Sequence, residues 1–156
     1  MIDPDHLLQL ADELSLPPRR GRPEQVRLRR AVSSAYYAAF HDICTQATDL
    51  FVGATERQHA RYLLVYRSFD HREIKAVCLQ SAQSRDSSPI LKTCAGLFVD
   101  LQAARHEADY NPSRTFTVLD VQSAVQKSRQ MIFGLELVDD EERKLFLTSL
   151  KFKNRT

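Results

Sequence analysis

The amino-acid sequence predicts an all-α protein, an up-and-down bundle of about five to seven helices. Apolar residues recur at the three- and four-residue spacing of a helix stripe in each long segment. Proline and glycine residues separate these segments, and no segment has the alternating pattern of a convincing β-strand. At 156 residues, of which 43% are hydrophobic, the chain is long enough to bury a core as a single domain spanning residues 1–156.

Two helices are expected at the start of the chain. Residues 3–16 form the first, because Asp3 can cap it and Pro4 suits its first turn. Pro23 begins the second, which we expect to continue to about residue 51. The apolar stripe of this second helix consists of residues three or four apart: Leu28, Val32, Ala35, Ala39 and Ile43.

Two shorter helices are expected next. Thr55 together with Gln58 can cap the first of them, and Asp70 can open the other. The residues expected on the apolar sides of these two helices are Ala60, Leu63, Leu64, Phe69, Ile74, Val77 and Cys78. The polar residues 81–88 are then expected to form an exposed loop.

A long helix follows, with Pro89 in its first turn and its end near Asn111, because Pro112 disfavours helical geometry at the residue before it. Its stripe contains Ile90, Cys94, Leu97, Phe98, Leu101, Ala104 and Ala108. Another helix begins after Thr117, where Asp120 supports the first turn. An acidic start predicts a final helix over residues 139–153.

Composition excludes several classes of function. No apolar run is long enough to cross a membrane, and no secretory signal precedes the first helix. Three cysteines, Cys44, Cys78 and Cys94, are far apart and sit among apolar residues, which predicts buried reduced thiols in a cytoplasmic protein. The five histidines lack metal-ligand spacing, and the chain has no glycine-rich phosphate loop, so neither a metal site nor a cofactor is expected: His6, His41, His59, His71 and His106.

An arginine cluster extends from the connection after the first helix into the start of the second helix, offset only by Glu24. Its members are Arg19, Arg20, Arg22, Arg27, Arg29 and Arg30. Arginine binds phosphate through a planar fork of donors, so the cluster could hold RNA or a nucleotide. The alternative is a solvated loop and helix start. Arginine near a helix N-terminus opposes the helix dipole, which favours a role outside the helix.

A second candidate site lies at the end of the long helix. Arg105, Asp109 and Tyr110 bring a guanidinium, a carboxylate and a phenol together, with Arg105 and Asp109 one turn apart at the edge of the buried stripe. The alternative is an ordinary ion pair between residues i and i+4, which contributes a few tenths of a kcal/mol.

These two regions carry a resemblance to a known family. Residues 28–41 contain an arginine, the pair Tyr36-Tyr37 among alanines, and then Phe40-His41. This pattern resembles the second-helix signature of HEPN-domain proteins. Residues 105–112 resemble the Arg-x-x-Ala-Asp-Tyr ending of one uncharacterised branch of that family. The resemblance covers about residues 24–134, and the C-terminal helix 139–153 is additional.

The resemblance implies a small helical bundle that usually dimerises, and rows of small residues on the second helix favour a homodimer as well. Many HEPN proteins are metal-independent endoribonuclease toxins, often encoded with a nucleotidyltransferase-type antitoxin. Others bind nucleotides or act as scaffolds. The ribonucleases use an Arg-x4–6-His motif, in which arginine would neutralise the phosphate and histidine would move a proton.

This sequence departs from that motif, because Tyr110 stands where histidine is first expected after Arg105. A phenol, with an ordinary pKa of about 10, is a weak general base at neutral pH. His106 lies about 100° around the helix axis from Arg105, and His41 would have to approach from the second helix. Whether the protein is an enzyme is therefore left open.

We therefore expect a toxin-antitoxin or defence-type protein that engages RNA or a nucleotide. Arg105, Asp109 and Tyr110 would form the site, assisted by the arginine cluster and supported by Tyr36, Tyr37, His41 and His106. The alternative is a non-catalytic interaction or scaffold module, which acts through dimerisation and a partner protein and in which the Arg105–Asp109 pair only locks the structure.

Overall fold

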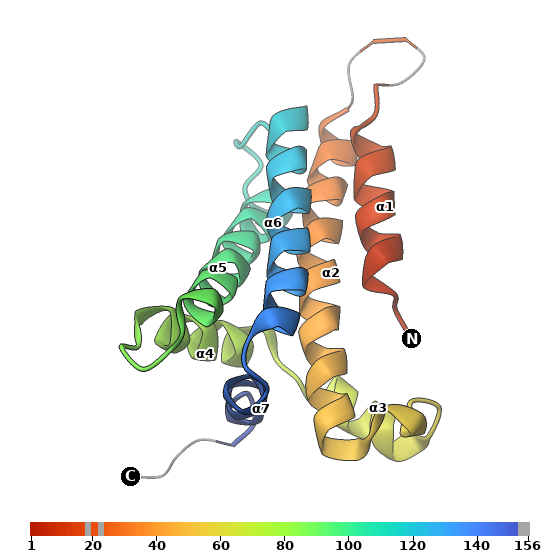
Figure 1. The fold of residues 1–156 in the computed structure, drawn as a ribbon. Coiled ribbons are helices and arrows are strands. Elements are labelled where there is room, and N and C mark those ends of the chain that lie inside the picture. Colours follow the sequence, from red (N-terminus) through yellow and green to blue (C-terminus); the bar gives the residue numbers. More distant parts are fainter. Residues whose placement is uncertain (18–19, 22–23, 153–156) are drawn as a thin grey trace.

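All the regular structure in the described part of the chain is helical, as the sequence predicts (Figure 1). The computed structural model describes residues 1–17, 20–21 and 24–152. These residues form seven α-helices and one short 3-10 helix: α1 (Pro4–Ser15), α2 (Gln25–Val52), η1 (Ala54–Glu56), α3 (Ala60–Arg67), α4 (His71–Gln83), α5 (Pro89–Tyr110), α6 (Val118–Leu137) and α7 (Asp140–Ser149).

Helix α2 lies at the centre of the bundle and packs against α1, α5 and α6. Successive members of this group run in opposite directions, so α1 is antiparallel to α2 and α5 is antiparallel to α6 (Figure 1). α5 is also antiparallel to α2, which brings the C-terminus of α5 to the N-terminal half of α2. The shorter helices α3, α4 and α7 gather at the opposite end of the bundle (Figure 1).

Most helix ends follow local capping chemistry. Asp3 accepts a hydrogen bond from the Asp5 backbone N–H at 2.9 Å, and Asp70 accepts from the first backbone N–H groups of α4. Thr117 and Asp120 form a capping box, in which each side chain accepts a hydrogen bond from the other residue's backbone N–H. These short-range contacts explain why the starts of α1, α4 and α6 agree with the sequence.

The segment around α3 differs from the expectation. Residues near Thr55 form η1, so Thr55 and Gln58 do not cap a helix, and α3 starts after His59. Tyr62 is the fully buried residue of α3, whereas Leu64 is exposed. The short helix docks on α2 through Tyr62, whose hydroxyl donates to Asp49 Oδ1 at 2.8 Å. The side of α3 that is buried is therefore the one that carries Tyr62 and its hydrogen bond to α2. The apolar pattern of α3 alone does not identify this side.

Further along the chain, helix bounds and faces shift by a few residues. α4 continues to Gln83, so the exposed connection begins at Ser84. On α5, Leu91 is buried and Ile90 is exposed. α7 ends at Ser149, before the expected residue 153, which lies outside the described residues.

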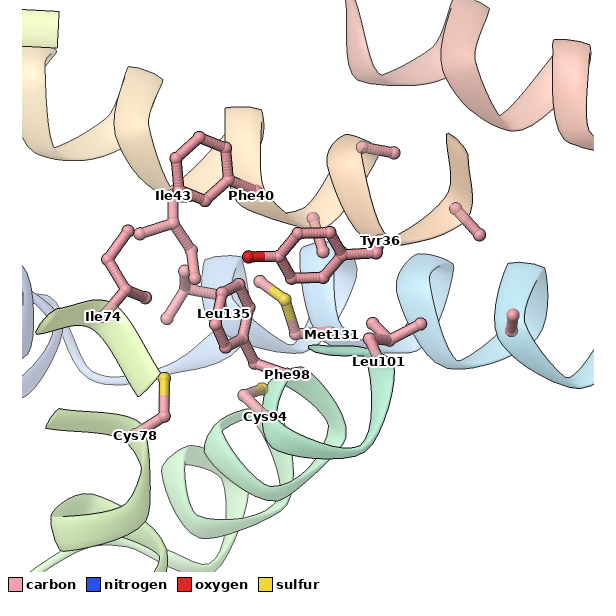
Figure 2. Packing of buried hydrophobic residues seen from close by; sticks show 14 of the residues in the cluster. Tyr36, Phe40, Ile43, Ile74, Cys78, Cys94, Phe98, Leu101, Met131 and Leu135 are labelled. Atoms are coloured by element: carbon pink, nitrogen blue, oxygen red, sulfur yellow. The ribbon is translucent and has the colours of Figure 1, made fainter. Parts of the chain in front are cut away.

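The core is formed where α2, α4, α5 and α6 meet (Figure 2). Tyr36 on α2 and Phe98 on α5 are fully buried, with ring centroids 5.6 Å apart. Ile74 from α4 and Met131 from α6 pack into the same cluster. Burying four such large side chains contributes on the order of 1.5–3 kcal/mol each.

The rows of small residues on α2 are used inside one chain. Ala31, Ala35, Ala38 and Ala39 are each fully buried against the neighbouring helices. They let α1, α5 and α6 approach α2 closely. These alanines therefore do not form a surface for a second copy.

A similar close approach joins α5 and α6. A Cβ atom at Gly134 would lie 2.7 Å from Cys94 Sγ, so a side chain at position 134 would require the Cys94 side chain or the contact between the two helices to shift. Within the described residues, every helix is too short or too polar to span a lipid bilayer.

Asp42 on α2 is a partly buried carboxyl group. Burial raises its pKa to about 7, and the charges of Glu136 on α6 and Asp5 on α1 act in the same direction. The hydrogen bond from Gln46 Nε2, at 2.8 Å, opposes this rise. The folded protein therefore keeps this proton between about pH 4 and pH 7, where an unfolded chain has released it.

We expect the free energy of unfolding to fall as pH rises through this window, and Asp42→Asn to remove that fall. At pH 8 the variant should be more stable than wild type by about 1 kcal/mol or more, because each pKa unit corresponds to about 1.4 kcal/mol. At pH 4 the two proteins should be nearly equal. Urea unfolding at both pH values measures this, with the exposed Asp86→Asn as control. An equal effect of Asp42→Asn at the two pH values would contradict it.

Candidate anion-binding site

The two regions that resemble HEPN signatures face each other in the structure. Ser33 on α2 donates a hydrogen bond to Asp109 Oδ1 on α5. One turn further along α2, Tyr37 Oη accepts a hydrogen bond from Arg105 Nη2 at 3.0 Å. The antiparallel packing of α2 and α5 thus places Arg105 and Asp109 beside the N-terminal half of α2.

Arg105 is held by its neighbours. Its Nε lies 2.7 Å from Asp109 Oδ2, although the N–H is not aligned with that oxygen, so the contact is an ion pair without a well-formed hydrogen bond. Its side chain is only 17% exposed. Burial opposes the positive charge, but Tyr37 and Asp109 outweigh it and the pKa of Arg105 lies above its ordinary value. Arg105 is therefore a permanent cation with a fixed orientation.

Three tyrosine rings surround this guanidinium. Arg105 Cζ lies 5.5 Å from the ring centroids of Tyr37 and Tyr110 and 5.9 Å from that of Tyr36. Aromatic faces attract cations, so these contacts add to the ion pair. Tyr36 is fully buried, whereas Tyr110 is 63% exposed. The Arg105 guanidinium therefore contacts both a core side chain, Tyr36, and a surface side chain, Tyr110.

His71, at the start of α4, lies behind Arg105. Its Nδ1 is 2.6 Å from Tyr36 Oη, and its ring stacks on Phe40 with centroids 4.0 Å apart. Burial, followed by the charge of Arg105, lowers the pKa of His71. Burial raises the pKa of Tyr36, so its phenol stays protonated at neutral pH and shares one hydrogen bond with Nδ1 of His71.

Sequence reasoning assigned no role to His71. The sequence shows only that His71 follows Asp70, the residue expected to cap the helix. No spacing between residues in the sequence links His71 to a residue of α5. The fold supplies that connection, since Gln102 of α5 also donates to the His71 carbonyl at 3.3 Å.

The other two expected histidines lie apart from Arg105. His41 Nδ1 is 2.6 Å from Tyr66 Oη, and burial, followed by His71, lowers the pKa of His41. Its ring stacks on Tyr37 at 6.1 Å. His106 is exposed and packs against Tyr110, with ring centroids 5.0 Å apart. Tyr37 and Tyr110 thus stand between these histidines and Arg105.

An open groove lies directly beside Arg105, with a volume of about 470 Å³. Its lining residues come from the start of α2 and the end of α5: Val26, Arg29, Arg30, Ser33, Tyr37, Ala108, Asp109 and Tyr110. Arg105 contacts Tyr37, Asp109 and Tyr110 of this wall. Arg29 and Arg30 in the lining and the adjoining Arg105 therefore outnumber the single lining carboxylate, Asp109.

The arginine cluster divides in the structure. Arg27 donates to the Glu13 and Leu14 carbonyls at the end of α1, at 3.3 and 3.4 Å. Arg20 is exposed, and Arg19 and Arg22 lie outside the described residues. Arg27 therefore stabilises a helix end and does not extend the groove.

Arg29 and Arg30 have different environments although they are adjacent. Arg29 donates to the Ala108 carbonyl at 2.9 Å, to the Pro112 carbonyl at 3.4 Å and to the Arg114 carbonyl, so it occupies acceptors that the end of α5 leaves free. Arg30 is exposed and makes no hydrogen bond or ion pair with any described residue. Arg30 is the cation of this groove that is free to meet a ligand.

The remaining reactive side chains offer no second site. In the described part of the chain, no group of three or more His, Cys, Asp or Glu side chains could hold a metal ion. Cys44, Cys78 and Cys94 are buried as free thiols, and burial raises the pKa of each, to about 12, 12 and 11. These thiols stay protonated at neutral pH and are poor nucleophiles.

Comparison of the chain with protein-family models, with curated proteins and with solved structures found no match. The resemblance to HEPN proteins therefore stays a prediction, which rests on residues 28–41 and 105–112.

The neighbouring arginines provide a matched pair of variants. Arg29→Ala should lower the free energy of unfolding by about 1–3 kcal/mol, because it leaves carbonyls at the end of α5 without a partner. Arg30→Ala should change it by less than about 0.5 kcal/mol, since Arg30 is exposed. Urea denaturation followed by circular dichroism measures both. Similar losses in the two variants would contradict the structural role of Arg29.

Proposed function

We propose that this protein is a HEPN-like member of a toxin-antitoxin or defence-type system that engages RNA or a nucleotide through phosphate. The observation that carries the proposal is the oriented Arg105 cation next to an open groove that also exposes Arg30, which pairs with no described residue. The site matches phosphate chemistry, because guanidinium groups bind phosphate oxygens through charge-assisted hydrogen bonds.

The contacts suggest a division of labour. Arg30 would meet the phosphate directly, since it lines the groove and is exposed. Asp109 and Tyr37 contact Nε and Nη2 of Arg105, and its Nη1 makes no hydrogen bond with a described residue. Arg105 would therefore supply positive charge and this remaining nitrogen from the side of the groove. Ser33 would hold Asp109 in place through its hydrogen bond and engage one of the carboxylate oxygens.

Metal-independent RNA cleavage is an extension of this proposal. In that reaction the ribose 2′-oxygen attacks phosphorus, its proton passes to a base, and the 5′-oxygen leaves with a proton from an acid. Arg105 would stabilise the phosphate charge, and the candidate for proton transfer would be His71, which contacts Tyr36 and whose pKa is lowered by burial and then by the charge of Arg105. Binding has the stronger support, because His41 and His71 are not among the described residues that line the groove.

One observation favours the alternative, a non-catalytic interaction or scaffold module. Two of the three nitrogens of Arg105 already contact side chains of the same chain, Asp109 and Tyr37. In this reading the Arg105–Asp109 pair only fastens the end of α5 to α2. A partly buried pair with these partners is sufficient for such a role without any ligand.

Substitution of Arg105 separates the two functions. If Arg105 serves phosphate binding, Arg105→Ala should weaken binding of a fluorescent single-stranded RNA at least about tenfold, and Arg105→Lys should restore it only in part, because the fork is lost. Asp109→Asn should tighten binding by removing a negative charge. Fluorescence anisotropy measures affinity, and a gel assay with EDTA on the same RNA reports cleavage.

Arg67→Ala is the control, because Arg67 is exposed on α3 at the other end of α2 and pairs with no described residue. Circular dichroism checks that each variant is folded. Equal RNA affinity of folded wild type and Arg105→Ala would leave the interaction-module function standing.

The biological context belongs to this proposal as well. We propose a nucleotidyltransferase-type antitoxin as partner, which the HEPN resemblance suggests. A cytoplasmic location is part of the proposal, supported by the three free buried thiols.

A homodimer also remains a proposal. Because the alanine rows of α2 are buried inside the chain, its support comes from apolar residues exposed on α6, namely Leu119, Phe133 and Leu137. Such residues are commonly covered by a partner when they gather on one surface.

We expect light scattering at micromolar concentration to give twice the monomer mass, and Phe133→Glu to shift the protein to monomer by placing a charge in the interface. Leu64→Glu, on the exposed side of α3, is a control that should leave the mass unchanged. A monomer mass for the wild type would remove the dimer.

A further inference from the structure

Tyr110 lines two adjacent grooves. The first is the groove beside Arg105. The second continues past the end of α5 and is lined by Gln25, Arg29, Ala108, Asp109, Tyr110, Pro112, Arg114 and Thr115. Arg29, Ala108, Asp109 and Tyr110 line both, so the two grooves form one continuous surface in which Tyr110 is the shared aromatic side chain.

Each groove has its own accessible arginine. Arg30 lines only the first groove, and Arg114 lines only the second of the two. The Arg114 side chain is 48% exposed, and its closest carboxylate contact is a 3.4 Å pair with Asp120. Exposed pairs of this kind contribute little and exchange readily with other anions. Two phosphates could thus be bound, one in each groove, with Tyr110 lining both grooves.

The Tyr110 side chain supplies a stacking surface in these grooves. It is 63% exposed, and His106 and Arg105 pack against it. Contact with the fixed Arg105 cation holds the phenol ring in place. An exposed aromatic ring in a groove that also carries cations is the arrangement by which proteins bind single-stranded nucleic acid, with a base on the ring and phosphates on the cations.

We infer that the ligand of this surface is a single-stranded nucleic acid that spans both grooves, with one base stacked on Tyr110 and flanking phosphates at Arg30 and Arg114. This inference rests on the proposed function and specifies its substrate class. A mononucleotide would occupy one groove alone. A duplex would offer no free base face to Tyr110, because its bases stack on each other.

The same surface recognises the strand without reading its sequence. Base edges are read chiefly by amide and charged side chains, of which Gln and Asn are the usual partners of adenine. Gln25 is occupied, since its Nε2 donates to the Phe116 carbonyl and its Oε1 accepts from the Phe116 N–H, both at 2.8 Å. Asn111 is occupied as well, by Glu107 Oε2 at 2.7 Å and the Ser113 N–H at 3.0 Å. Stacking and phosphate contacts remain, and these tolerate any base.

The test compares four probes on the full chain: eight-nucleotide strands of uridine and of adenosine, the self-paired duplex of a mixed eight-mer, and uridine monophosphate. Tyr110→Ala should weaken binding of both strands roughly tenfold, whereas Tyr110→Phe should bind as wild type because the ring remains. Arg114→Ala should weaken strand binding but leave monophosphate binding unchanged. The two strands should bind within about threefold of each other.

Salt dependence counts the phosphate contacts. The slope of log affinity against log salt is about 0.7 per phosphate for a single strand, so Arg30→Ala and Arg114→Ala should each lower it by about that amount. Leu64→Ala is the control for Tyr110→Ala, because Leu64 is a similarly exposed apolar side chain (73%) and lies outside both grooves. Arg67→Ala is the control for the arginine variants.

The outcomes separate this inference from the proposed function. If Arg30→Ala and Arg105→Ala weaken binding while Tyr110→Ala and Arg114→Ala do not, phosphate binding stands and the two-groove ligand is wrong. Equal affinity for strand and monophosphate, tighter binding of the duplex, or a tenfold preference between the two strands also overturns the inference. If no probe binds the folded wild type, both the inference and the proposed function fail.

Discussion

The candidate site depends on the antiparallel contact between the end of α5 and the start of α2. A helix C-terminus leaves several carbonyls without partners and carries negative potential, and Arg29 satisfies both needs from the neighbouring helix. Ser33 fastens Asp109 in the same interface. These contacts place the Arg105 side chain against α2, where it donates a hydrogen bond to Tyr37 and lies among the surrounding tyrosine rings. The geometry at the surface is therefore a consequence of how one helix end is stabilised.

This arrangement also explains the charge pattern of the groove. Asp109 partly neutralises the charge of Arg105, and Arg29 donates its hydrogen bonds to backbone carbonyls. Neither side chain can reorient toward a ligand without losing these contacts. Arg30, in contrast, is exposed and makes no hydrogen bond or ion pair with a described residue. The protein thus combines a partly buried charge held by its neighbours with an exposed one, and an exposed tyrosine lines the same groove. Such a surface suits a ligand with repeated charges and flat bases better than a compact ion, which would need several convergent donors.

Much of the fold could be predicted because its signals are local. Asp3, Asp70 and Thr117 cap helices through bonds that span two or three residues, and Pro112 ends α5 by steric hindrance at the preceding residue. Faces were harder to assign where a helix is short. On α3, Leu64 fits an apolar stripe as well as Tyr62 does, and only the hydrogen bond of Tyr62 to Asp49 across to α2 selects the buried side.

The sequence by itself determined the helices, their order and the pairing of Arg105 with Asp109, because a regular helix places residues four apart on one side. It could not determine which arginines of the cluster are free. Arg27, Arg29 and Arg30 look alike in sequence, yet two of them serve helix ends that belong to other elements. Only the tertiary structure decided that, and only it placed His71 beside Tyr36 and Arg105. The physical reason is that helix periodicity is set within one turn, whereas contacts between helices depend on how whole faces pack.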